Sequence, residues 1–315
     1  MNVAHSLEDR IGAAYQAAAI HNAGNSDLKT IDSIVRENLA ETLNSLTAWD
    51  RIQIARHPKR PHSLDYLESL FTDLDWIAGD RAHGDDKALL AGWGEFCGST
   101  VAILAQQKGR TLKERLERNS GMMHPEGYRK AARLAKLAEK FSCPLLCFID
   151  TPGAYAGIEA ELRGQSDAIA QNLKLFSTLQ TPIINIVIGE GCSGGALGIG
   201  IGDRLLMQEY SYLSTISPEG CASILFKSAD KAAYAAEQMH ITAHELKALK
   251  LIDRIIPESV GGAHWNTDLT KDFLKSVIQE ELHILKNIDL AHLVEHRLQK
   301  ILSIGHEINA FADLS

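Results

Sequence analysis

The spacing of hydrophobic and polar positions divides the chain into three stretches. Up to about residue 56, apolar side chains such as Ile31 and Val35 recur every three or four positions, which predicts helices. From about residue 88, short apolar runs predict buried strands, most clearly residues 144–150 (PLLCFID) and 182–188 (PIINIVI). Beyond Pro257 the helical spacing returns. The pattern therefore predicts an α/β core with N-terminal and C-terminal helical extensions.

Turn residues and helical segments place the boundaries of these stretches. The proline-containing basic segment 57–63 (HPKRPHS) ends the first helical stretch. We expect one more amphipathic helix over residues 65–79, stopped by Gly79, and helices between the strands over residues 127–141 and 159–179. Strands that alternate with helices indicate parallel strands joined by helical crossovers. We divide the chain into a helical arm (1–63), a core (64–262) and a helical tail (263–315).

Composition and charge exclude several classes of protein. The 315 residues carry a net charge of −8, which argues against a nucleic acid or an anionic membrane as a partner. None of the five cysteines forms a C-x-x-C pair, so we predict neither a zinc ribbon nor any other metal site in this chain. The N-terminus lacks the pattern of a signal peptide, and no run of 18 apolar residues occurs. We expect a soluble cytoplasmic protein.

Two glycine-rich turns follow two of the predicted strands. TPGAYAG (151–157) comes after Asp150, and GEGCSGG (189–195) comes after Ile188, each with a helix predicted directly behind it. A turn of this kind presents backbone N–H groups at the positive end of a helix, with little side chain in the way of an anionic ligand. Because the turns follow successive parallel strands, we expect them to lie at the same edge of the sheet.

The second turn is compatible with three kinds of chemistry. Residues 189–194 match the dinucleotide-binding pattern G-x-G-x-x-G, although Ser214 occupies the place where that pattern requires an acidic residue. Residues 191–195 match G-x-S-x-G, which would make the protein an α/β serine hydrolase. Its nucleophile would be Ser193, with Asp230 or Asp253 and then His264 completing a triad. In the third interpretation both turns act as backbone donors, and no side chain is a nucleophile.

Nine longer motifs favour the third interpretation through a family resemblance. These motifs are ARHPKRPHSLDY, GDRAHGDDKAL, QQKGR, HPEGYRKAARL, FIDTPGAYAG, RGQSDAIAQNL, GEGCSGGALGIGIGD, YSYLSTISPEGCASILFKSADKA and LKLIDRIIPE. On them the chain closely resembles the alpha-subunit family of bacterial acetyl-CoA carboxylase carboxyltransferase, over about residues 47–264. Several long motifs in the right order are far more specific than one glycine pattern.

The resemblance implies a fold, a reaction and partners. The fold would be a crotonase-like spiral of ββα units. The reaction would be transfer of a carboxyl group from carboxybiotin, borne by the biotin carboxyl carrier protein, to acetyl-CoA. The product, malonyl-CoA, begins fatty acid synthesis. The chain would be active only with a zinc-ribbon beta subunit that binds acetyl-CoA, in an α2β2 heterotetramer that works with biotin carboxylase. Biotin would not be attached to this chain.

The resemblance also implies roles for residues of both turns. Gly194 and Gly195 would form an oxyanion hole for the charge on the biotin ureido oxygen. The carboxybiotin side of the site would be lined by Gly153, Ala154, Tyr155, Gly157, Gly191 and Ser193.

The chain departs from the family pattern at two positions. Ala156 stands where the family has proline, and Cys192 stands where it has glycine. A positive φ at Cys192 would be costly for a side chain of its size. The basic run Lys108, Arg110, Lys113 and Arg115 predicts a solvated helix, or else a contact with a CoA phosphate or the partner.

Overall fold

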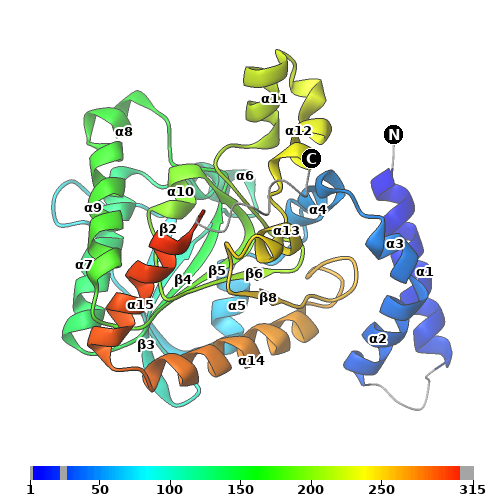
Figure 1. Ribbon diagram of the computed structural model, residues 1–315, viewed down its shortest axis with the longest axis horizontal. Coiled ribbons are helices and arrows are strands. Elements are labelled where there is room, and N and C mark those ends of the chain that lie inside the picture. The colour runs from blue at the N-terminus through cyan, green and yellow to red at the C-terminus, as the bar shows by residue number, and fades with distance from the viewer. Residues whose placement is uncertain (1–2, 22–26, 306–315) are drawn as a thin grey trace.

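The core of the protein is an eight-stranded mixed sheet (Figure 1). A computed structural model describes residues 3–21 and 27–305, so the ends of the predicted arm and tail lie outside the described residues. The main path of the sheet runs β1 (Thr72–Trp76), β2 (Leu89–Phe96), β3 (Ser99–Gln106), β4 (Leu145–Thr151), β5 (Ile183–Cys192), β6 (Arg204–Gln208) and β8 (Arg254–Ile256). β7 (Tyr212–Ser214) pairs with the far end of β5.

The strands from β3 onward are parallel, as predicted, but the first three are antiparallel. Cys97 and Gly98 join β2 to β3 with positive φ values of 49° and 74°. Two such residues form the tight turn that matches the twist of an antiparallel hairpin. The expectation of helical crossovers was therefore wrong for this part of the sheet.

The helix expected over residues 65–79 is also wrong in its second half. α5 (Ser63–Leu70) ends at Leu70, and residues 72–76 form the edge strand β1. The backbone groups of β2 find partners there, in a ladder whose register shifts between Thr72 and Asp75. Pairing with β2 thus overrides the helical spacing of a short segment.

Two layers of helices cover the sheet. α7 (Pro125–Lys140) and α9 (Gln165–Thr178) pack on one face, and α5 and α14 (Thr267–Lys286) pack on the other. Side chains of β4 alternate between the two cores, because successive strand residues point to opposite faces: Cys147 joins the first core and Phe148 the second. A mixed sheet with helices on both faces, preceded and followed by helices, confirms the predicted α/β class.

Shorter helices gather beyond the ends of β4 and β5. The helix expected over residues 159–179 is broken at Gly164, which has a φ of 80°, into α8 (Ile158–Leu162) and α9. The other short helices of the core are α6 (Leu112–Glu117), α10 (Ser193–Leu197), α11 (Pro218–Phe226), α12 (Ala232–Met239) and α13 (Ala243–Ala248), with 3₁₀ turns at Asn119–Gly121 and Ala229–Lys231. Figure 1 shows α8, α10, α11 and α12 in the upper half of the molecule.

Helices at both ends pack on the core. The N-terminal arm consists of α1 (Val3–His21), α2 (Leu28–Asn38), α3 (Ala40–Asn44) and α4 (Ala48–Ala55), and its cluster of buried side chains includes Tyr210 and Val260 of the core. α15 (Leu290–Ser303) is fixed by the fully buried Arg297, which pairs with Asp203 at 2.9 Å. The three-part division of the chain stays a prediction. No helix in the described ranges is long and apolar enough to cross a bilayer.

Candidate active site

The two glycine-rich turns meet where β4 and β5 end. Thr151 pairs with Gly191 in the sheet. A Cβ atom added to Gly195 would lie only 2.6 Å from the backbone nitrogen of Ala154 and from the carbonyl oxygen of Gly153. The backbones of the turns are therefore in direct contact, and only glycine fits at this point.

The second turn begins later than the sequence indicated. β5 does not end at Ile188 but continues to Cys192, because residues 190–192 pair with β7. Cys192 is extended, with a φ of −126°, and the positive φ of 56° belongs to Ser193. Cys192 therefore carries none of the backbone strain that a positive φ would impose. Burial, with the nearby charge of Glu190, raises the pKa of the Cys192 thiol to about 11, so it is protonated and a poor nucleophile near neutral pH.

α10 begins with the glycine pair singled out from the sequence. Its first residues are Ser193, Gly194 and Gly195, whose N–H groups have no acceptor four residues back within the helix. Ser193 is exposed, Gly194 is half-buried, and Gly195 and Gly191 are buried. A ligand can thus approach the start of α10 from the side of Ser193 and Gly194.

The first turn is anchored by its neighbours. The ring of Tyr155 stacks on His124 with 4.1 Å between ring centres, and its backbone N–H donates to the carbonyl of Met123 at 3.0 Å. Gly153 has a φ of 152° and is buried, whereas Ala154, Tyr155 and Gly157 are half-buried and Ala156 is exposed. All of the predicted site residues therefore belong to two adjoining turns.

The structure does not assemble the hydrolase alternative. Asp253 accepts the N–H of Leu205 at 2.6 Å and pairs with Lys300. The His264 ring stacks on His57, with 3.8 Å between ring centres. Asp230, the other candidate acid, accepts the Ser228 hydroxyl at 3.4 Å. In the part of the chain that the structure describes, none of these side chains bonds Ser193.

The dinucleotide alternative gains no support either. Ser214, at the place of the required acid, pairs within the sheet through β7. Glu219, the next acidic residue, is held in an ion pair by Arg56 at 2.5 Å.

A buried ion cluster behind the turns was missed. Lys108, expected on a solvated helix, precedes α6 and bridges Asp150 at 2.7 Å and Glu190 at 2.6 Å. Arg56 binds the other oxygen of Glu190 at 2.7 Å. Despite burial, which raises the pKa of Glu190, Lys108 and Arg56 lower it to about 2. A cavity of ≈ 270 Å³ opens beside the cluster and is also lined by Pro152. The sequence did contain a sign of this cluster, because each of the two apolar strands ends near an acidic residue, Asp150 in β4 and Glu190 in β5.

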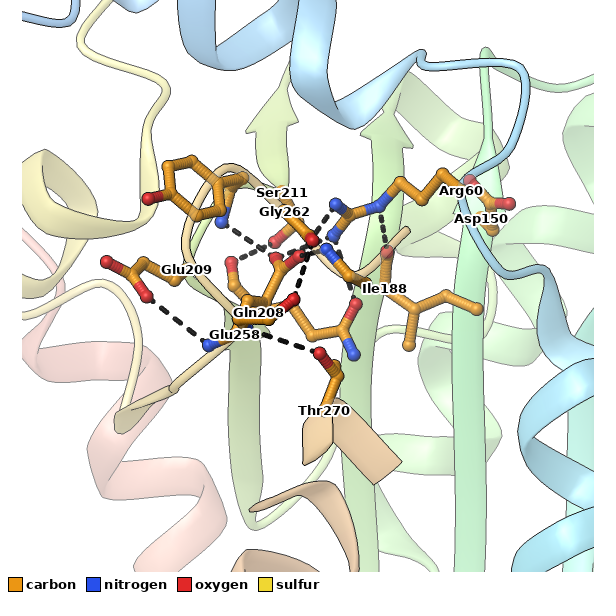
Figure 2. A network of polar contacts seen from close by, with 12 residues as sticks. Arg60, Asp150, Ile188, Gln208, Glu209, Ser211, Glu258, Gly262 and Thr270 are labelled. Atoms are coloured by element: carbon orange, nitrogen blue, oxygen red, sulfur yellow. Dashed lines mark hydrogen bonds and ion pairs between the residues drawn. The ribbon is translucent and has the colours of Figure 1, made fainter. Parts of the chain in front are cut away.

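A second buried network supports β5 just before its turn. Figure 2 shows Arg60 between Ile188 and Glu258. The Arg60 guanidinium donates to the Ile188 carbonyl at 2.8 Å and to both oxygens of Glu258 at 2.7 and 2.8 Å. Glu258 also accepts the backbone N–H groups of Tyr210 and Ala263. Burying charges costs desolvation energy, but here each charge is paired and hydrogen-bonded. The network can therefore hold the end of β5 in a fixed position.

One cluster among the described residues has atom types that ligate metals. Glu8, His57 and His264 offer ligand atoms within 4.8 Å of one another. His57 Nδ1, however, accepts the N–H of Lys59 at 3.2 Å, so the neutral ring carries its proton on Nε2, which bonds Glu8 at 2.9 Å. A metal at Nε2 would require that proton to move and the Lys59 bond to break.

The fold and the joined turns define a crotonase-like α/β protein, and comparisons extend this to the family. Residues 3–305 match the model of a protein family described as "Acetyl co-enzyme A carboxylase carboxyltransferase-like". The chain belongs to this family. It is 50% identical over 280 residues to acetyl-coenzyme A carboxylase carboxyl transferase subunit alpha of Francisella philomiragia subsp. philomiragia, covering 89% of both chains. The same identity and coverage hold for the protein of that name from Francisella tularensis subsp. novicida.

Solved structures of low sequence identity share the fold. The transcarboxylase 12S structure with methylmalonyl-coenzyme A and methylmalonic acid bound aligns with a TM-score of 0.60 at 18% identity, covering 74% of this chain and 44% of that one. A Pseudomonas malonate decarboxylase hetero-tetramer in complex with coenzyme A aligns with a TM-score of 0.58 at 17% identity. That alignment covers 84% of this chain and 99% of the other. The family match and the relatives of 50% identity, rather than these structures, identify the chain as belonging to a biotin-dependent carboxyltransferase.

Proposed function

We propose that this chain is the alpha half of an acetyl-CoA carboxylase carboxyltransferase. It would receive carboxybiotin from the biotin carboxyl carrier protein, and a beta subunit would supply acetyl-CoA, in an α2β2 cytoplasmic assembly that works with biotin carboxylase. Malonyl-CoA would be the product. The observation that carries the proposal is the direct seating of Gly195 on Gly153, which joins two backbone-donor turns into one surface.

The two turns suit a group that develops negative charge. Carboxybiotin supplies the carboxyl group and leaves negative charge on its ureido oxygen. The N–H groups of Gly194 and Gly195 at the start of α10 are donors fixed before any substrate arrives, and losing one such donor costs about 10²–10³ in rate. Gly153, Ala154, Tyr155, Gly157, Gly191 and Ser193 make up the surrounding backbone and side chains. Gly153, Gly191 and Gly195 are buried, and glycine at these positions keeps side chains out of the surface that the two turns form.

The need for a partner is supported by exposed apolar side chains near the turns. Ile158 and Leu162 on α8 are 79% and 81% exposed, and Leu197 on α10 is 47% exposed. Exposed apolar side chains of this size are candidates for an interaction surface. α8 follows the first turn and α10 begins in the second, and Figure 1 shows both helices in the upper half of the molecule. A beta subunit seated there would complete the site and exclude water from it.

The test is malonyl-CoA decarboxylation with a biotin derivative as carboxyl acceptor. The assay is run on this chain alone, on its cognate beta subunit alone and on the mixture. Activity confined to the mixture supports the proposal. An inactive mixture that still assembles into a complex contradicts the assigned reaction, and ester cleavage by the lone chain would favour a hydrolase.

A further inference from the structure

Side-chain bonds replace the sheet ladder at the point where β4 and β5 approach their turns. The pairing is regular up to Ile149 and Val187, then shifts so that Thr151 faces Gly191. Across this break, Asp150 Oδ1 accepts the backbone N–H of Glu190 at 3.0 Å. The spacing of the two strand ends therefore depends on what holds Asp150 and Glu190 together.

Lys108 is the group that holds them. Its Nζ lies 2.7 Å from Asp150 Oδ1 and 2.6 Å from Glu190 Oε1, and its side chain is only 16% exposed. Among the described residues it is the one cation in ion-pair contact with Asp150. Two carboxylates this close repel each other in a buried site unless a cation lies between them.

A strained loop keeps Lys108 in place. A Cβ on Gly121 would lie 2.9 Å from both Lys108 Cγ and the carbonyl oxygen of Asp150, so the loop closes directly over the lysine stem. Asn119, Ser120 and Gly121 all have positive φ, at 47°, 53° and 86°. Consecutive left-handed residues that are not glycine persist only where the surroundings enforce them, and they concentrate at functional sites.

The side chain of Gln106 connects the same strand ends to the glycine pair. Gln106, fully buried at the end of β3, accepts the N–H of Asp150 at 3.1 Å and donates to the Gly195 carbonyl at 2.8 Å. Movement of Asp150 would therefore be transmitted to α10 as well as to the turn that begins at Thr151.

We propose that Lys108 is a positioning residue, which neutralises Asp150 and Glu190 and so fixes the relative placement of Gly153 and Gly195. This inference rests on the proposed carboxyltransferase function and deepens it. Lys108 acts through the strand ends and has no assigned contact with substrate. Burial lowers the pKa of Lys108, but the charges of Asp150 and Glu190 outweigh this and raise it, so the bridge stays charged near neutral pH.

The experiment compares variants in complex with the beta subunit. Lys108→Met should lower kcat about 10²-fold, since a misplacement of about 1 Å costs that much, and leave KM for malonyl-CoA within about 2-fold. Lys108→Arg, which keeps the charge, should recover part of the loss. Arg204→Met is the matched control: it breaks the Arg204–Glu281 pair (2.8 Å) on β6 and should leave kcat unchanged.

Two readouts separate positioning from a merely structural role. Without Lys108, Arg56 and the Tyr212 hydroxyl still bond Glu190, but Asp150 loses its ion-pair partner. Protonation of one carboxylate then relieves the repulsion, so the kcat deficit of Lys108→Met should shrink as pH falls from about 8 to about 6. Lys108→Met/Glu190→Gln should likewise be more active than Lys108→Met and also serves if the single variant does not fold. A deficit that is constant with pH and unrelieved by Glu190→Gln overturns the inference, as does an unchanged kcat.

Amide hydrogen exchange makes the test independent of the assigned reaction. Exchange at residues 151–155 and 193–197 should accelerate in Lys108→Met and not in Arg204→Met. Equal exchange in both variants would overturn the positioning role even if the wild-type mixture were inactive. An inactive wild-type mixture with the predicted exchange would instead refute the carboxyltransferase proposal alone.

Discussion

Gly195→Ala tests the contact between the two turns with one methyl group. The added Cβ would lie 2.6 Å from the Ala154 nitrogen and the Gly153 carbonyl oxygen, where ordinary van der Waals contact begins at 3.4 Å. Both atoms are backbone, so no side-chain rotation can make room. The first turn and the start of α10 must therefore separate.

The size of the effect follows from the difference between 2.6 Å and the ordinary contact distance of 3.4 Å. Relief requires a displacement approaching about 1 Å, and a displacement of that size can cost about 10² in rate. Overpacking costs about 1–3 kcal/mol of unfolding free energy, partly offset by the gain of up to about 1 kcal/mol for replacing glycine with alanine in a helix. We expect kcat to fall by about 10-fold to 100-fold, while the unfolding free energy falls by only about 1–2 kcal/mol.

Gly12→Ala in α1 is the matched control. A Cβ there would meet only the Trp265 ring, at 3.4 and 3.8 Å, which is ordinary van der Waals contact. Gly12 lies outside both turns, so we expect stability to change by less than about 1 kcal/mol and kcat to stay at its wild-type value.

Urea unfolding and carboxyl transfer in the mixture with the beta subunit measure both variants. If Gly195→Ala keeps wild-type kcat, or if Gly12→Ala lowers kcat as much, the contact between the turns does not position the site.

Four further predictions follow from individual residues. Ser193→Ala should change carboxyl transfer by no more than about 3-fold, whereas loss of a catalytic serine can cost about 10⁶-fold; a collapse of activity would show that the Ser193 hydroxyl takes part in the reaction. Arg297→Met leaves Asp203 buried and unpaired, and should lower the unfolding free energy by about 3–5 kcal/mol in urea titration; a loss below about 1 kcal/mol would show that the pair does not fix α15. Burial, with the charge of His57, lowers the pKa of His264 from 6.5 to about 3, so the folded state binds fewer protons and stability falls as pH drops from 6.5 toward 3. His264→Phe should remove up to about 1.4 kcal/mol per pH unit of that dependence, and an unchanged slope would contradict the assignment. Ile158→Lys/Leu162→Lys should leave the melting temperature of the lone chain unchanged but weaken assembly with the beta subunit in analytical ultracentrifugation, unlike Leu302→Lys on α15, which is 53% exposed; equal affinity would move the interface elsewhere.

The predictable part of the fold was the part with strong local patterns. α7 matches the predicted helix over residues 127–141 closely, and β4 matches its continuous apolar run. β1 was not predictable, because five residues with one half-buried position form a strand only through their pairing with β2. The extension of β5 to Cys192 depends in the same way on β7, which lies about 20 residues further along the chain.

Part of the candidate site could likewise be predicted from the sequence, and part depends on tertiary contacts. Glycine spacing and the family resemblance led to both turns and to the start of α10. Neither could indicate that Gly195 rests on Gly153, because that contact depends on the register between β4 and β5. Lys108 was misjudged because local charge patterning favours solvent, and only the tertiary structure brings Asp150 and Glu190 to it.

The most direct test of the central claim, that the joined turns form one half of a shared site, is a titration of this chain into a fixed amount of its beta subunit. Malonyl-CoA decarboxylation with a biotin acceptor is followed throughout. The account predicts no activity from either chain alone and a rate that saturates when the chains are equimolar. Full activity of the beta subunit alone, or a rate that does not depend on this chain, would contradict it.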